Sequence, residues 1–294
     1  SAASDVYKET ALLADESLAK DLKAEGLRFS SANSINIGRL VPQIVYYIYA
    51  YAQLIKDEKI KAGDEINIVV PTGNFGNVLA AYYASQIGLP VKQFIVASNE
   101  NNVLTDFFTT GKYDSNRHFK VTNAPAMDIL VSSNLERLLY FASGQNSDEI
   151  QAYMTALQED GAYVIKPDTR ANLNKFVAAF ATQDQVSETI KKIANATNYT
   201  IDPHTAVGRY AYEQTGVTGP TLIAATASPY KFSETVLQAL NMAPVSGQAA
   251  LAQLSKMTGT EIPIQIATLF NKPIRHKQVI DSKQILATLK HEIF

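Results

Sequence analysis

The residues with the most evident chemistry form a glycine turn between a predicted strand and a predicted helix. The run Ile66–Val70 is rich in β-branched residues, the turn 71–76 contains Gly73 and Gly76, and good helix formers follow from Asn77 to Ala84. The first amide groups of a helix lack intrahelical partners and lie at the positive end of its dipole. Glycines also let an anion approach the backbone closely. The turn therefore predicts a binding site for a phosphate or a similar anion.

This turn matches none of the phosphate-binding motifs that have a fixed spacing. It contains no lysine, which a P-loop requires, and it lacks the GxGxxG spacing of dinucleotide-binding loops. From these residues alone, an ordinary strand-to-helix turn remains the alternative interpretation.

Three further side chains could serve a site near this turn. Arg39 lies one turn into a predicted helix, 34–56, where it could bind an anion or pair locally at the surface. Thr226 follows the predicted strand 220–225 at its carboxyl end, where open α/β sheets bind ligands. His204 lies at a predicted helix N-terminus, which favours the neutral ring, and we expect it to make a structural hydrogen bond.

Composition excludes several classes of function. The 294 residues carry a formal net charge of −2, which gives no electrostatic case for binding nucleic acid or an anionic membrane. The chain has no cysteine and its four histidines have no ligand spacing, so we expect neither disulfides nor a metal site. No run of 18 apolar residues and no signal peptide are present, so we expect no membrane span and a cytoplasmic location.

The hydrophobic patterns predict an α/β protein with an open, parallel-type sheet and flanking helices. Predicted strands cover 66–70, 91–97 and 220–225, with a possible short strand at 27–30. Predicted helices cover 4–25, 34–56 with a kink at Pro42, 77–84, 101–111, two segments within 125–160, 171–197, and four short pieces within 233–294. Helix 34–56 is apolar on most sides, which is typical of a core or interface helix, and we expect its four tyrosines to pack in the core: Tyr46, Tyr47, Tyr49 and Tyr51.

Five stretches, in this order along the chain, resemble the threonine synthase family of enzymes that use pyridoxal 5'-phosphate (PLP). They are Ser31–Asn36, Pro71–Asn77, Ser98–Asn101, Asp202–Val207 and Ala225–Phe232. The resemblance implies the tryptophan-synthase-β-like fold of fold type II PLP enzymes. The chain departs from the family at Asn102 and Ser228, where the family commonly has Asp and His.

The resemblance also implies roles for individual residues. The cofactor phosphate would lie against Gly73, Asn74, Phe75, Gly76 and Asn77, and Thr226 would face the pyridine nitrogen. The pocket wall would include Asn33, Ser34, Arg39 and Lys231, with Lys231 as a candidate for the substrate phosphate.

One expected catalytic group is missing from this sequence. In the family the Schiff-base lysine lies in a Phe-Lys-Asp context well before the glycine turn, and no lysine here has that context; the nearest similar context is that of Lys175. We therefore expect no catalytic residue in this chain, and an α/β domain that is incomplete at its N-terminus. On this hypothesis residues 1–30 are a remnant of a preceding subdomain, 31–235 the PLP-binding domain and 236–294 a helical segment packed on it. The missing N-terminal region of the same protein would be its partner.

The resemblance implies a C-terminal portion of an enzyme that converts O-phospho-L-homoserine and water to L-threonine and phosphate. The chain alone would then be inactive. Two alternatives stay open. The first is another fold type II PLP lyase, such as a dehydratase or a phospholyase. The second is a non-catalytic binding domain derived from the enzyme, which the missing lysine favours.

Overall fold

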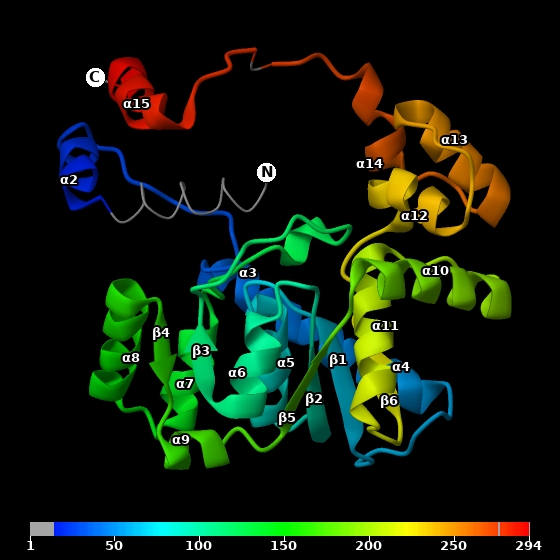
Figure 1. Cartoon of the computed structure of the whole chain (residues 1–294), viewed down its shortest axis with the longest axis horizontal. Helices are drawn as coiled ribbons and strands as arrows, with labels where there is room; N and C mark the ends of the chain where they lie inside the picture. The colour runs from blue at the N-terminus through cyan, green and yellow to red at the C-terminus, as the bar shows by residue number, and fades with distance from the viewer. Residues whose placement is uncertain (1–14, 276, 294) are drawn as a thin grey trace. The chain divides into compact units, whose positions relative to one another are not determined.

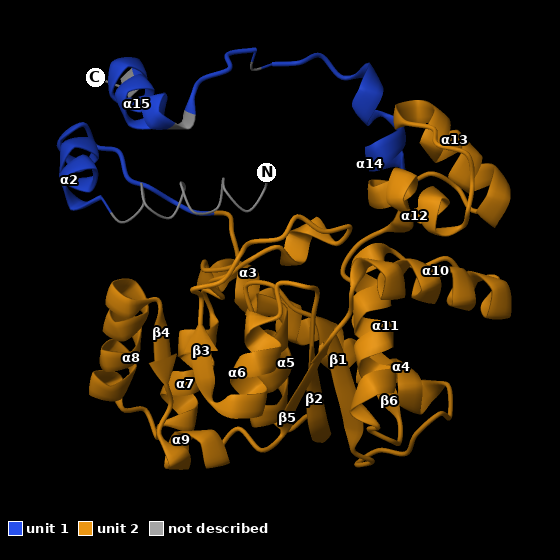
Figure 2. Cartoon of the chain, in the orientation of Figure 1, with its two compact units in different colours: residues 1–31, 263–294 blue, residues 32–262 orange. Residues whose placement is uncertain are grey.

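The computed structural model describes residues 15–275 and 277–293. The chain divides into two compact units: one is Ala32–Ile262, and the other consists of the two ends of the chain, Ser1–Ser31 and Pro263–Phe294 (Figure 2). Of the helix predicted over 4–25, the structure has α2, Glu16–Ala24, while residues 4–14 lie outside the described part. Residues 27–30 form no strand. The domain boundaries at 30 and 235 stay predictions.

The larger unit is built on a parallel sheet of four strands in the order β5-β2-β1-β6 (Figure 1). The strands are β1 (Ile66–Pro71), β2 (Val91–Ser98), β5 (Phe176–Phe180) and β6 (Thr221–Ile223). Strand β1 is buried along its whole length and pairs with both β2 and β6, as its continuous apolar run suggests. The α/β class, the parallel sheet and the three predicted strands are confirmed.

The direction of the chain through the sheet reverses at β1. The chain runs from β1 through α5 (Gly76–Gln86) to β2 and then β5, and returns through α10 (Gln183–Thr197) and α11 (Pro203–Thr215) to β6. Because parallel crossovers are right-handed, this reversal places α5 and α11 on opposite faces. Open α/β sheets bind ligands at the carboxyl ends of the strands beside such a reversal. The ends of β1 and β6 are therefore where a ligand is expected.

The remaining elements surround this sheet or belong to the chain ends. A short antiparallel pair joins β3 (Lys112–Asp114) to β4 (Ala162–Val164). The other α-helices are α3 (Ile37–Leu40), α4 (Ile44–Lys56), α6 (Val103–Thr110), α7 (Leu135–Ala142), α8 (Ser147–Asp160), α9 (Pro167–Ala171), α12 (Ser233–Ala239), α13 (Gly247–Thr258), α14 (Ile264–Ala267) and α15 (Ile285–Ile293). Short 3-10 turns lie at Val41–Gln43, Pro125–Met127, Pro229–Phe232, Leu269–Asn271 and Ser282–Gln284. Within the described ranges, no helix has the length and apolar character needed to cross a membrane.

Strand β5 corrects the prediction of a helix over residues 171–197. Residues 176–180 pair with β2 along the edge of the sheet, and the helix begins only after Thr182, which caps α10 with Gln185 in a capping box. The run Phe-Val-Ala-Ala-Phe has no alternation and contains two alanines, which favour helix. Pairing with β2 overrides that local preference.

The long apolar helix is interrupted at Pro42, as predicted, by the 3-10 turn between α3 and α4. Tyr47 and Tyr51 are buried in the core, which confirms the prediction for these two. Tyr46 and Tyr49 are exposed, so the core prediction is wrong for them. The apolar character of α4 therefore extends from its packed face around to its exposed one.

Glu149 is a buried carboxylate that ties α8 to the start of α9. It accepts hydrogen bonds from the hydroxyls of Tyr153 (2.6 Å) and Thr169 (2.5 Å) and from Lys166 Nζ (2.9 Å). Burial alone would raise the pKa of Glu149, but these donors outweigh it and hold the pKa below its ordinary value. The folded state therefore favours the charged form.

This arrangement predicts an acid-sensitive contribution to stability. Because the pKa of Glu149 is lower in the folded than in the unfolded chain, the contribution is full above the ordinary pKa of about 4.3 and is lost as the pH falls through the folded value. We expect Glu149→Gln to lower the free energy of unfolding by about 1–3 kcal/mol at pH 7, and by much less at pH 3. Urea denaturation at both pH values measures this, with the exposed Glu159→Gln as the control. An equal loss at both pH values would contradict the assignment.

Candidate functional site

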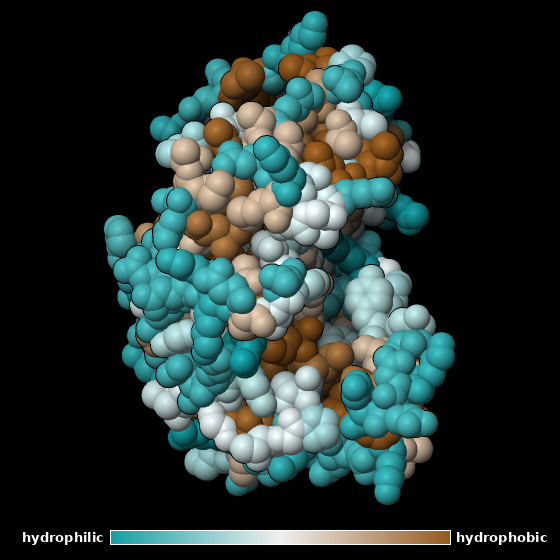
Figure 3. Space-filling model, turned by 90° about the vertical axis from the view of Figure 1, so that its right-hand side faces the viewer, coloured by the Kyte–Doolittle hydropathy of each residue, from teal (hydrophilic) through white to brown (hydrophobic). Residues whose placement is uncertain are grey.

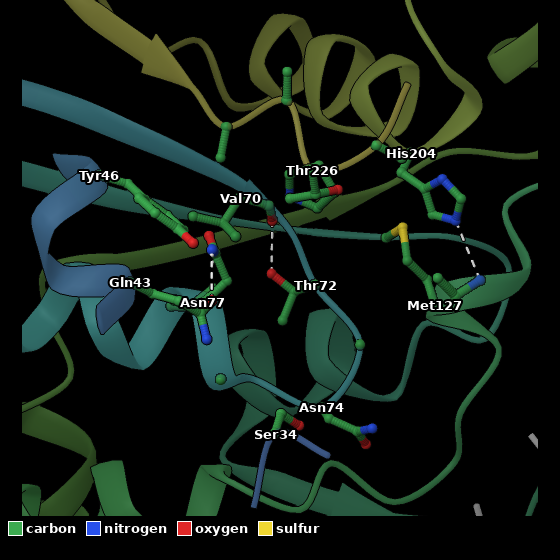
Figure 4. Close-up of a pocket in the computed structure, with 18 of the residues that line it drawn as sticks. Ser34, Gln43, Tyr46, Val70, Thr72, Asn74, Asn77, Met127, His204 and Thr226 are labelled. Carbon is green, nitrogen blue, oxygen red and sulfur yellow. Dashed lines mark hydrogen bonds between the residues drawn. The ribbon is translucent and has the colours of Figure 1, made fainter. Parts of the chain in front are cut away.

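A pocket of about 740 Å³ lies at the carboxyl ends of β1 and β6, beside the reversal of the sheet. Its lining comes from the glycine turn, the end of β6, α4 and the 3-10 turn at Pro125–Met127. Figure 4 shows Thr226 across the pocket from Asn74 and Ser34. Figure 3 views the side of the molecule that carries α4 and β6, where apolar side chains line a hollow bordered by hydrophilic ones.

The glycine turn presents the start of α5 without a cap. Phe75 precedes the helix with a left-handed backbone (φ 63°), and no side chain caps the helix. Its ring is buried and stacks on Phe108 with 5.9 Å between ring centroids, which holds this unusual backbone conformation in place. In the part of the chain that the structure describes, the amide groups of Phe75, Gly76 and Asn77 have no hydrogen-bond acceptor. These amides are therefore available to a ligand.

Both glycines of the turn lie in close contact with other segments. A Cβ on Gly73 would lie 2.9 Å from the carbonyl oxygen of Ala126, and one on Gly76 would lie 3.1 Å from Cβ of Ser34. Neither glycine has a positive φ, so close packing accounts for them and backbone conformation does not. The turn is therefore closely packed against the segments that carry Ala126 and Ser34.

The side chain of Asn77 is hydrogen-bonded to α4 and to the 3-10 turn that precedes α4. Its Nδ2 donates to Oε1 of Gln43 at 2.9 Å, and the hydroxyl of Tyr47 donates to its Oδ1 (Figure 4 shows the first bond). Burial raises the pKa of Tyr47 far above its ordinary value, so the phenol stays protonated and remains a donor. Asn77 can therefore offer a ligand its backbone amide, while its side chain fixes the helix start against α4.

His204 has the structural role expected from the sequence. Its Nε2 accepts the amide hydrogen of Ala126 at 3.1 Å, and its Nδ1 lies 3.0 Å from Oδ1 of Asp202. Because an acceptor at Nε2 carries no proton, the proton is on Nδ1 and the ring is neutral. The ring also packs 4.7 Å from that of Phe232. His204 thus holds the Ala126 segment beside Gly73.

The Ser98–Asn101 stretch forms a polar cluster behind the same segment. Asn99 and Asn101 donate to Oδ1 of the buried Asp128 at 2.7 and 3.1 Å. Thr122 donates to both oxygens of that carboxylate through its hydroxyl (2.7 Å) and its amide (3.0 Å). This family-like stretch therefore anchors the loop that carries Ala126.

The two departures from the family pattern have partners of their own. Asn102 accepts a hydrogen bond from Arg117 at 3.1 Å, and Arg117 also pairs with Asp106 at 2.9 Å. Ser228 caps the 3-10 turn that follows it by accepting the amide of Tyr230 at 3.3 Å. Both positions are satisfied with the residues present.

The pocket brings together nearly all of the residues predicted for it. The lining includes Ser34, Arg39, Gly73, Asn74, Phe75, Gly76, Asn77, Thr226 and Lys231. Asn33 is not among the lining residues, and its side chain accepts the amide of Ile35 at 2.9 Å. Arg39 also holds the carbonyl of Ala32 at 2.6 Å. Among the described residues, no group of three or more His, Cys, Asp or Glu could hold a metal ion.

Other residues of the site are not evident from the sequence. They come from segments far from the turn: Gln43, Ala126, Met127, Ser132 and Asn134. The last two donate to carbonyls of the glycine turn. No motif marks these positions, because their roles depend on long-range contacts.

Comparison with known proteins gives consistent matches. Residues 205–289 match the family model described as "Threonine synthase, C-terminal". The chain is 39% identical over 224 residues to "Threonine synthase-like 1" of Homo sapiens, with 75% of this chain and 30% of that protein aligned. It is 38% identical over 237 residues to the threonine synthase of Schizosaccharomyces pombe, with 72% and 46% aligned.

Solved structures agree with these relatives. The threonine synthase from yeast superposes with a TM-score of 0.77 at 27% identity, covering 97% of this chain and 57% of that one. The PLP-bound threonine synthase from Brucella melitensis superposes with a TM-score of 0.72 at 31% identity, covering 87% and 52%. The chain spans about a third to a little over half of the length of these relatives. From the family model, the curated relatives and the structures together, the chain belongs to the threonine synthase family, whose fold is that of fold type II PLP enzymes.

Proposed function

We propose that this chain forms the part of a threonine synthase active site that binds the phosphate group of the cofactor. The observation that carries the proposal is the uncapped start of α5, with free amides at Phe75, Gly76 and Asn77 inside a pocket at the sheet reversal. Backbone amides at a helix start are well suited to a phosphate monoester. A Cβ would clash with the backbone at Gly73 and would be tightly packed at Gly76. These residues fit the phosphate group of PLP.

Other lining residues would orient the cofactor and the substrate. Thr226 follows β6 and would place a neutral hydroxyl at the pyridine nitrogen, which leaves that nitrogen without a carboxylate partner. Arg39 and Lys231 supply positive charge to the pocket wall, where an anionic substrate would bind, and Ser34 supplies a hydroxyl. Bound PLP supplies the electron sink that makes protons next to the substrate amine removable.

On this proposal the substrate is O-phospho-L-homoserine and the products are L-threonine and phosphate. Residues 31–235 would form the PLP-binding domain, with 236–294 as a helical segment packed on it. The lysine that the family uses would come from a preceding region of the same protein. Two facts support this: no lysine here has the family's Phe-Lys-Asp context, and the chain spans only part of its relatives.

The test is phosphate release from O-phospho-L-homoserine in the presence of PLP. It compares this chain with the same chain extended by its native upstream sequence. We expect activity only in the extended chain. An extended chain that binds PLP without releasing phosphate would favour another lyase of this fold. An extended chain that neither binds PLP nor reacts would favour a non-catalytic binding domain.

A further inference from the structure

Two buried side chains outside the pocket motifs hold the carbonyl groups of the glycine turn. The Ser132 hydroxyl donates to the carbonyl oxygen of Gly73 at 2.8 Å. Asn134 donates to the carbonyl oxygen of Asn74 through its Nδ2 at 2.7 Å and its backbone amide at 3.2 Å. Asn134 is fully buried and Ser132 is nearly so. The carbonyl groups of Gly73 and Asn74 thus each have a hydrogen-bond donor in a fixed position.

Because each peptide group is planar and trans, these hydrogen bonds to the carbonyls also fix the direction of the amides that follow them. In a trans peptide the carbonyl and the following N–H point to opposite sides of the chain. Holding the carbonyl of Gly73 therefore points the amide of Asn74 away from Ser132. Holding the carbonyl of Asn74 likewise points the amide of Phe75 away from Asn134. Because buried carbonyls strongly require partners, other rotations of these two peptides are disfavoured.

Asn134 is itself held in one orientation. Nη1 of Arg137 donates to its Oδ1 at 2.8 Å, so the amide group must direct Nδ2 toward the turn. Nη2 of Arg137 also donates to the carbonyl of Ile35 at 2.8 Å, and Nδ2 of Asn134 lies 3.4 Å from the hydroxyl of Ser34. The hydrogen bonds of Asn134 and Arg137 thus connect the glycine turn to the segment that carries Ser34.

Ser132 is held in place by a hydrogen bond of its own backbone amide. Its amide donates to the hydroxyl of Tyr113 at 2.8 Å, and that hydroxyl donates to the carbonyl of Leu130 at 3.1 Å. Tyr113 is buried and stacks on Tyr163 with 5.2 Å between ring centroids. The support of the turn therefore extends into the aromatic core.

We propose that Ser132 and Asn134 are positioning residues that orient the amides of the glycine turn for an anion. The inference rests on the proposed role of the turn in binding the PLP phosphate. Neither residue touches the ligand in this scheme. Their effect passes through the carbonyls of Gly73 and Asn74, so it is separable from that of the lining side chains.

The test uses Ser132→Ala and Asn134→Asp in the full chain. The first removes one hydroxyl, and the second keeps an oxygen for Arg137 while replacing the donor toward Asn74 by an acceptor. Ser132→Thr retains the hydroxyl and should restore wild-type behaviour. The matched control is Ser143→Ala, which deletes a similar hydroxyl-to-carbonyl bond, 3.0 Å to Tyr140, away from the pocket.

Two readouts separate this inference from the proposed function. Backbone 15N order parameters of residues 73–77 without ligand should be lower in Ser132→Ala and Asn134→Asp, because their peptide groups are freer to rotate, and unchanged in the control. Titration with inorganic phosphate and with PLP should show both ligands weakened about tenfold in those two variants, the size expected for one lost hydrogen bond.

Unchanged order parameters in both folded variants would overturn the positioning role. Wild-type chain that binds neither phosphate nor PLP would overturn the proposed function, and the order parameters would still decide the positioning role. Should Asn134→Asp fail to fold, the Ser132→Ala and Ser132→Thr pair decides alone.

Discussion

Replacing Gly73 by alanine should weaken PLP binding to the chain by at least about tenfold. The new Cβ would lie 2.9 Å from the carbonyl oxygen of Ala126. The segment that carries this atom is held by the hydrogen bond of the Ala126 amide to His204 and by the bonds that Asp128 accepts. The turn must then move away from the Ala126 segment, and its amides move with it. Overpacking of this kind costs about 1–3 kcal/mol. We expect a loss of that size in the free energy of unfolding as well.

A second glycine variant separates lost affinity from lost stability. Gly216 ends α11 with φ 65° and has open space around its Cβ position, so Gly216→Ala should cost about 1–2 kcal/mol through backbone strain alone. It lies outside the pocket lining. Fluorescence titration with PLP should show wild-type affinity for Gly216→Ala and weakened binding for Gly73→Ala. Equal affinities in the two variants would contradict the placement of the cofactor phosphate.

Replacing Asp202 by alanine should give the largest loss of stability. The carboxylate is buried and caps α11 by accepting the amides of His204 (2.9 Å) and Thr205 (3.4 Å). It also accepts the Thr205 hydroxyl and the Nδ1–H of His204. Removing it leaves several buried donors without an acceptor, which costs about 3–5 kcal/mol. Chemical denaturation at pH 7 measures the change.

Asp202→Asn is the matched control for this prediction. It keeps an oxygen for the helix cap and for His204 and loses only the acceptor of the Thr205 hydroxyl. We expect a loss of about 1–2 kcal/mol, which is typical of one compromised buried bond. A loss below about 1 kcal/mol in Asp202→Ala would show that the cap and the histidine contact contribute little.

The strand, turn and helix around Gly73 were predictable because their signals are local. A β-branched run, a glycine turn and a helix-forming run each fix a conformation through their own residues. The break at Pro42 was predictable for the same reason. Strand β5 was not, because its alanines favour helix and only pairing with β2 decides its state.

The site was predictable as far as its motifs extend. The glycine turn, Arg39, Thr226 and Lys231 line one pocket, and their roles in binding stay predictions. The side chain of Asn33 accepts the amide of Ile35, whereas the neighbouring Ser34 lines the pocket. The sequence does not indicate which of these two adjacent polar residues faces the pocket. Ser132 and Asn134 contact the turn from about 60 residues away in sequence, so their role appears only when tertiary contacts are known.

The central claim is that the amides of the glycine turn bind the phosphate of PLP. It is tested most directly by titrating PLP into the 15N-labelled chain and following the backbone amide signals. We predict saturable shifts that are largest at Gly73–Asn77, with a further shift at Thr226. Inorganic phosphate should reproduce the shifts at the turn without the shift at Thr226. Absence of saturable shifts at the turn, or shifts concentrated outside the pocket, would contradict the claim.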